Sequence, residues 1–176
     1  MNYVSENSVG SFVSSNCMII TDPCYDYDPR QVIEDMLPGK WNAEVLVSDE
    51  GSWGQRIAEL RIVHDEHDVS NYDYDCVSKF EVGVDSGQAG FFDSFMYPRG
   101  STGEYGELDT FYGKACEMTL SEDGAGVFPF GVVSRTGYGD GGYSLWTVKR
   151  NGKVIAAKIV FIEEDYENEY SDDEEE

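Results

Sequence analysis

Basic residues are scarce in this chain: 12 lysines and arginines stand against 35 aspartates and glutamates, which gives a formal net charge of −23. Ten of the acids lie in residues 163–176, so residues 1–162 alone hold 25 acids and 12 bases. A surface of this sign repels phosphates and anionic lipid and attracts cations or basic protein surfaces. The charge therefore disfavours direct nucleic-acid binding and favours a basic protein partner, although solubility alone also accounts for it.

Paired cysteines and long apolar runs are also missing. The four cysteines form no C-x-x-C pair and have no histidines at zinc-finger spacing, which disfavours a structural zinc site. No run approaches the ~18 apolar residues of a membrane span, and the N-terminus lacks the basic start and apolar stretch of a secretory signal. We therefore expect no membrane insertion and a cytoplasmic protein with reduced thiols.

The length of the chain suits a single domain. We expect residues 1–162 to form one β-rich globular domain. Residues 163–176 cannot bury apolar area against their own charge, so we expect them to be an acidic disordered tail.

Several segments predict strands. Residues 40–47 place Trp41, Ala43, Val45 and Val47 on one face, and residues 55–63 form a second strand that should pair with them. Asn151-Gly152 joins residues 143–150 and 153–162 into an antiparallel hairpin, because both residues tolerate the positive φ of its turn.

Two short helices and an N-terminal hairpin complete the prediction. Residues 28–37 suit a helix, with Asp28 as its cap and Pro29 at its first position, and residues 108–120 suit a second one. Residues 10–13 and 17–20 should pair as a hairpin. The expected fold is mainly β with α elements at its margins: an antiparallel β-sandwich or partly open barrel with two short helices.

The run Phe80–Asp93, FEVGVDSGQAGFFD, predicts two short strands around a tight bend. Its three glycines, Gly83, Gly87 and Gly90, fit places where the backbone needs positive φ or close approach. Four aspartates of the chain lie at such glycine- or proline-marked turns: Asp22, Asp85, Asp93 and Asp140.

These aspartates leave two interpretations open. If the fold brings them together, they could hold a divalent ion or act as paired acid and base, with Cys24 as a further candidate catalytic group. A ligand pocket would then draw on Asp22, Tyr25, Asp85, Gln88, Asp93, Asp140 and Tyr143. If the fold keeps them apart, they are four separate surface turns.

Three other motifs match known patterns only in part. Gly137–Gly142 reads G-x-G-x-x-G but a strand follows it, so a turn that presents Asp140 is favoured over a dinucleotide site. Residues 71–75 copy the opening of a calcium loop without its later glycine and glutamate. His64 and His67 would point to opposite sides of an extended chain. We expect residues 64–75 to form a mobile acidic loop and the protein to need no cofactor.

Four stretches carry a family resemblance: TDPCY at 21–25, WGQRIAEL at 53–60, VDSGQAGFFD at 84–93 and GYGDGGY at 137–143. They resemble a family of small, mostly uncharacterised bacterial and bacteriophage proteins, and the likeness covers most of residues 9–162. The resemblance implies a phage or bacterial cytoplasmic protein and implies no particular activity.

The leading hypothesis from the sequence is a non-enzymatic acidic binding protein. Such a protein could be a phage factor that binds and inhibits a host protein by presenting a nucleic-acid-like charged surface. The alternative is a small metal-dependent hydrolase, or a ligand or nucleotide pocket built from the turn carboxylates.

Overall fold

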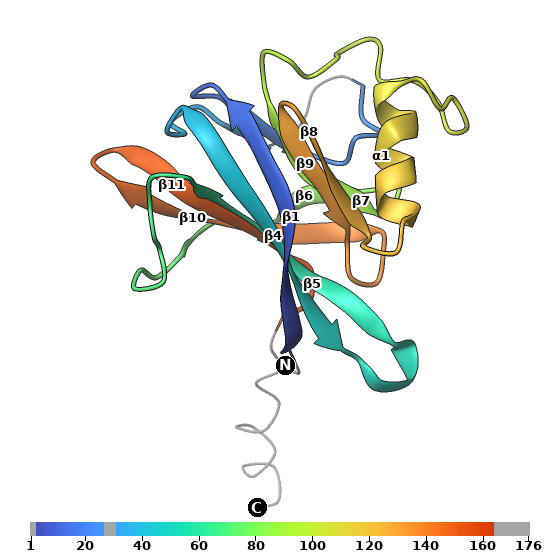
Figure 1. Ribbon diagram of the computed structural model, residues 1–176, viewed down its shortest axis with the longest axis horizontal. Helices are drawn as coiled ribbons and strands as arrows, with labels where there is room; N and C mark the ends of the chain where they lie inside the picture. Colours follow the sequence, from blue (N-terminus) through green and yellow to red (C-terminus); the bar gives the residue numbers. More distant parts are fainter. Residues whose placement is uncertain (1–2, 27–30, 164–176) are drawn as a thin grey trace, which may run out of the picture.

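The computed structural model describes residues 3–26 and 31–163. Two antiparallel sheets pack against each other, which confirms the predicted antiparallel β-sandwich (Figure 1). The predicted acidic tail, apart from Glu163, lies outside the described residues.

The larger sheet has six strands, and it contains both strand pairs that the sequence predicts most clearly. β4 pairs with β5, and β10 pairs with β11 across a turn in which Asn151 has a φ of 53°. In spatial order the strands are β1 (Tyr3–Ser14), β4 (Gly39–Asp49), β5 (Gln55–His64), β11 (Lys153–Val160), β10 (Gly141–Arg150) and β6 (Asp75–Val84).

The smaller sheet has five strands and is built around β7, which is buried along its whole length. Burial on both faces explains the continuous apolar character of this strand. In spatial order the strands are β3 (Gln31–Ile33), β2 (Met18–Thr21), β7 (Gln88–Asp93), β9 (Gly131–Arg135) and β8 (Ala125–Phe128).

Two predictions about the N-terminal third are wrong. Residues 10–13 do not pair with residues 17–20, because β1 pairs with β4 while β2, buried throughout, pairs with β3 and β7 in the other sheet. Residues 31–33 form strand β3 rather than part of a helix, and the cap assigned to Asp28 and Pro29 lies outside the described residues. β-branched Val32 and Ile33 suit a strand as well as a helix, and hydrogen bonding to β2 is what makes this segment a strand.

Only one α-helix, α1 (Phe111–Leu120), is present in the described part of the chain, with a short 3-10 turn η1 (Gly51–Trp53). The helix lies inside the predicted range 108–120. Thr110 caps its N-terminus by accepting a hydrogen bond from the Gly113 N–H at 3.1 Å. Neither of these helices is long and apolar enough to cross a membrane.

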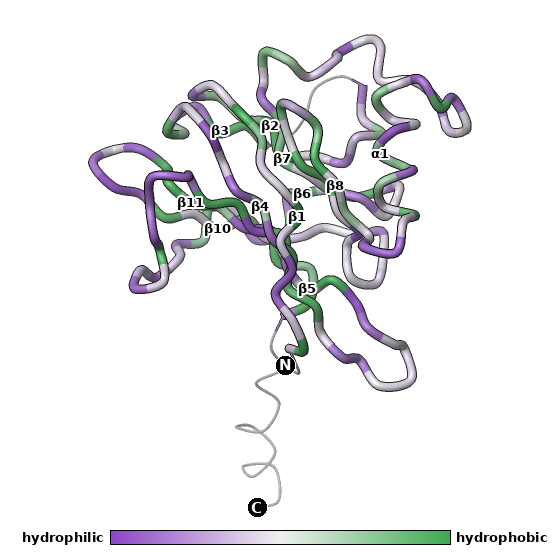
Figure 2. The backbone as a smooth tube through the Cα atoms, viewed as in Figure 1, coloured by the Kyte–Doolittle hydropathy of each residue, from purple (hydrophilic) through white to green (hydrophobic). Residues whose placement is uncertain are grey.

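The core lies between the sheets. Trp41, Phe91, Leu60 and Leu145 are fully buried in the main apolar cluster, and a second cluster under α1 centres on Phe92. Figure 2 shows hydrophobic residues along the central strands and hydrophilic residues in the loops that leave the sandwich, such as residues 65–74.

Candidate functional site

The bend between β6 and β7 carries the chain from one sheet to the other, and the Asp22 carboxylate holds it in place. Asp22 is fully buried. Its Oδ1 accepts hydrogen bonds from the Cys24 N–H at 2.8 Å and the Ser86 hydroxyl at 2.6 Å. Its Oδ2 accepts from the N–H groups of Asp85 at 3.0 Å and Ser86 at 2.7 Å. Asp22 therefore ties the turn after β2 to the bend at residues 85–87.

Two other predicted carboxylates reach the same bend. Asp140 Oδ1 accepts a hydrogen bond from the Gly87 N–H at 2.9 Å, and Asp85 Oδ2 accepts one from the Tyr25 hydroxyl. Gly87 has a φ of 70°, a conformation that side-chain-bearing residues rarely adopt. Three of the four predicted aspartates thus meet at one place, together with Tyr25.

The Tyr143 side chain contacts the backbone of the turn that carries Asp140. Its hydroxyl lies 2.5 Å from the Gly139 carbonyl oxygen and 3.2 Å from that of Thr136. The side chain thereby fixes the glycine-rich turn that presents Asp140. A strand, β10, follows this turn, as the sequence predicts.

Asp93 lies away from this group, whereas Gln88 directly follows the bend but turns its side chain toward α1. Asp93, at the opposite end of β7, accepts hydrogen bonds from Ser15 Oγ at 2.5 Å, Ser15 N at 3.2 Å and Ser14 Oγ at 3.3 Å. At about 3.3 Å per strand residue, roughly 17 Å separate the two ends of β7. Gln88 faces α1, where Nε2 contacts Cys116 Sγ at 3.4 Å, and its Oε1 is buried without a partner among the described residues.

An open acidic pocket of about 770 Å³ lies beside the bend. Tyr25, Glu81, Asp85 and Asp140 line it, and Gln31 Nε2 donates to Glu81 Oε2 at 2.7 Å. Carboxylates offer only acceptor atoms, so this pocket suits a positively charged group that donates hydrogen bonds.

No metal centre follows from these side chains. Within residues 3–26 and 31–163, no group of three or more histidines, cysteines, aspartates or glutamates is arranged to hold a metal ion. The His64 Nε2 lies 2.8 Å from the Pro38 carbonyl oxygen, and its ring packs edge-on against Trp41. His64 is therefore held by local structural contacts.

The thiol and the phenol near the bend both stay protonated at neutral pH. Burial, and next the negative charge of Asp22, raise the pKa of Cys24 from its ordinary 9.0 to about 12. Burial and the hydrogen bond to Asp85 likewise raise the pKa of Tyr25. Cys24 therefore lacks the electropositive surroundings that make a cysteine nucleophilic.

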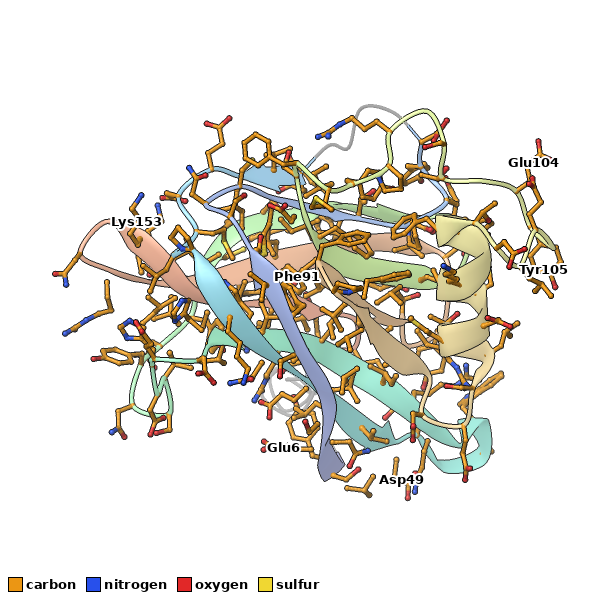
Figure 3. The ribbon with its side chains drawn as sticks, turned by 45° about the horizontal axis from the view of Figure 1, so that its top comes forward. Glu6, Asp49, Phe91, Glu104, Tyr105 and Lys153 are labelled. Carbon is orange, nitrogen blue, oxygen red and sulfur yellow. The ribbon has the colours of Figure 1, made fainter. Side chains whose placement is uncertain are left out.

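A different surface, missed by the sequence motifs, lies at residues 94–123, which we call the α1 segment. It exposes a group of large apolar side chains, among them Phe95 at 76% and Tyr105 at 78% of their area. The full group is Phe95, Met96, Tyr105, Leu108 and Leu120. Figure 3 shows Glu104 and Tyr105 at the outer end of the loop, beyond α1 and away from the sheets.

Acids are interspersed with these apolar residues along the segment. The α1 segment contains only two bases, Arg99 and Lys114, against six acids: Glu104, Glu107, Asp109, Glu117, Glu122 and Asp123. Its loop is anchored to the domain, because Asp26 Oδ1 accepts hydrogen bonds from Thr102 N at 3.0 Å and Thr102 Oγ1 at 2.8 Å. The excess of acids among aromatic residues in a segment rich in glycine could have indicated this surface from sequence.

Comparison of the chain with protein-family models, with curated proteins and with solved structures found no match. The resemblance of its four conspicuous stretches to a bacterial and phage family therefore stays a prediction.

Proposed function

We propose that this chain is a non-enzymatic acidic binding protein whose α1 segment contacts a basic surface of a partner protein. The observation that carries the proposal is the combination, in residues 94–123, of exposed aromatic and aliphatic side chains with six acids and only two bases. Aromatic anchors supply most of the energy of protein interfaces, and rim charges guide the approach of the partner.

The distribution of charge supports this proposal. Among the described acids only Asp22, Glu59 and Asp93 are buried, so nearly all of the negative charge of the domain lies at its surface. The ion pairs of the described residues involve only three bases: Arg61, Lys149 and Lys158. Little of the surface charge is therefore neutralised within the molecule, and a basic partner would experience a strong attractive field.

The hydrogen bonding of the turn aspartates favours binding over catalysis. Both carboxylate oxygens of Asp22 accept hydrogen bonds from backbone or hydroxyl donors. Asp140 accepts one from the Gly87 N–H, and Asp85 accepts one from the Tyr25 hydroxyl, so each fixes one end of the bend. These are tasks of structural groups. We extend the proposal to a bacterial or phage protein of the cytoplasm that binds and inhibits a host protein, which agrees with the four free thiols and with the family resemblance.

Charge removal from the α1 segment tests the proposal. The chain is used to capture partners from nuclease-treated bacterial lysate, and the captured protein is then titrated against purified variants. We expect a triple variant to weaken binding about tenfold at low salt, with a smaller salt dependence. The variant carries three substitutions: Glu117→Gln, Glu122→Gln and Asp123→Asn.

The matched control removes three exposed acids elsewhere: Glu34→Gln, Glu66→Gln and Asp75→Asn. Both triple variants lose three negative charges, so any difference between them reports the position of the charges and not the net charge. We expect only the α1 segment variant to lose most of its affinity for the partner. Equal losses in the two triples, capture of no basic protein, or retention that ignores salt would each contradict the proposal.

The catalytic alternative is tested by the reactivity of Cys24. With a pKa near 12 its thiolate is about 1000-fold scarcer than at the ordinary 9.0, so iodoacetamide should modify Cys24 far more slowly than exposed Cys76. Mass spectrometry of timed samples measures both rates, and unfolding in urea should make them similar. Rapid labelling of Cys24 in the native protein would contradict this expectation and support Cys24 as a nucleophile.

A further inference from the structure

The outer face of the six-stranded sheet carries a groove of about 940 Å³ that the proposed function does not use. Side chains of β5, β11, β10 and β6 form its floor, and the loop at residues 65–74 adds Tyr72 and Tyr74. We propose that this groove binds a neutral oligosaccharide. Three features of its lining carry the proposal.

The first feature is a fixed charge network in the floor. Glu59 is only 4% exposed, although it lies on the outward face of the sheet. Arg61 lies 2.5 Å from the Glu59 carboxylate and Lys158 lies 3.4 Å from it. Glu59 therefore holds the donor groups of Arg61 and Lys158 in fixed positions, and a small number of placed polar groups is what gives a binding site its specificity.

The second feature is a set of aromatic rings. The groove is lined by Tyr3, Tyr72, Tyr74, Phe80 and Trp146. The Lys158 Nζ lies 4.6 Å from the centre of the Tyr74 ring, and the Trp146 indole N–H donates to Ser144 Oγ at 2.9 Å, so these rings are held in position. Phe80 is 74% exposed. Rings of this kind offer flat apolar faces against which the C–H faces of a sugar ring can pack.

The third feature is the balance of charge. Three bases, Arg61, Lys79 and Lys158, line the groove together with three acids, Glu59, Asp73 and Glu163. A polyanion or polycation would meet repulsion from half of this lining. Hydroxyl groups both donate and accept hydrogen bonds, so a neutral polyhydroxylated chain matches a lining that contains both donors and acceptors. The volume lies at the upper end of the range for small-molecule sites.

Three neutral hexasaccharides test the proposal: maltohexaose, cellohexaose and chitohexaose. Each is titrated into the full chain by calorimetry, and we expect at least one to bind. Its affinity should stay constant from about 0.05 to about 0.5 M salt, because a neutral ligand releases no counterions. Failure of all three to bind at millimolar concentration, or loss of binding with salt, would overturn the proposal.

Substitutions in the groove locate the site. Trp146→Ala and Phe80→Ala should each weaken binding about tenfold, while Trp53→Phe, in the β4–β5 hairpin, should leave it unchanged. Trp146 is partly buried, so Trp146→Ala could disturb folding. In that case the affinity of Phe80→Ala, which replaces an exposed side chain, tests the assignment. Wild-type affinity in the Phe80 variant would refute the assignment.

Lysine substitutions provide the matched control. Lys79 and Lys114 are both exposed, but Lys79 lines the groove, whereas Lys114 lies on α1, which packs against β8 and β9 of the smaller sheet. Lys79→Ala should weaken binding several-fold and Lys114→Ala should not. Equal behaviour of these two variants would place the ligand elsewhere on the protein.

Discussion

Replacement of Asp22 with alanine is expected to lower the free energy of unfolding by about 4 kcal/mol. The substitution leaves the N–H groups of Cys24, Asp85 and Ser86, and the Ser86 hydroxyl, without the acceptor that they share. Each donor left without a partner in a buried place costs about 1–3 kcal/mol, and the relaxing bend should recover part of this sum. Urea unfolding followed by circular dichroism measures the change.

Asp140→Ala is the matched control, because it removes a carboxylate that contacts the same bend. Asp140 accepts a single backbone hydrogen bond there, from Gly87. We expect a loss of about 1 kcal/mol for this variant. If Asp22→Ala costs no more than Asp140→Ala, the buried carboxylate does not organise the crossing between the two sheets.

Sequence patterns predict those parts of the fold that depend on neighbouring residues. The alternation in residues 40–47 shows which side chains face the core, and Asn151-Gly152 supplies a turn whose geometry sets the register of two strands. In both cases the pairing partner is the next strand along the chain. These two pairings can therefore be predicted from local chemistry.

The pairing of strands in the N-terminal third cannot be predicted from neighbouring residues. β1 and β2 are adjacent in sequence, but β1 pairs with β4 and β2 pairs with β7, about 70 residues further on. Nothing in residues 10–20 marks this choice. Likewise β3 has only three residues, and Gln31 Nε2 donates to Glu81 across the gap between the sheets. Such contacts exist only once the whole fold is in place.

The candidate site likewise combines features that are local in sequence with contacts that depend on the whole fold. Glycine and proline correctly indicate that Asp22, Asp85, Asp93 and Asp140 lie at or next to turns, but the topology decides which of them meet. Asp93 is separated from the other three because it lies at the far end of β7. In the groove, Glu59 and Lys158 are 99 residues apart, although Glu59 and Arg61 within an apolar strand already indicate a polar outer face.

Gly90→Ala is expected to destabilise the protein by about 3 kcal/mol, because an added methyl group has no space. A Cβ at Gly90 would lie 2.1 Å from the Val132 carbonyl oxygen and 2.6 Å from a ring atom of Phe92. The first atom belongs to the backbone of β9, which pairs with β7, and the ring is packed in the cluster under α1. Neither neighbour can move without breaking sheet or core contacts, so the loss should appear in urea unfolding.

Gly83→Ala separates this steric effect from the general effect of replacing glycine. Both residues lie in strands with no positive φ, but a Cβ at Gly83 would meet only the Tyr25 hydroxyl, at the ordinary contact distance of 3.7 Å. Alanine also restricts the unfolded chain, so Gly83→Ala should stabilise the protein by about 0.5 kcal/mol. Equal stabilities for the two variants would mean that β7 and β9 do not approach each other as closely as the register between Gly90 and Val133 requires.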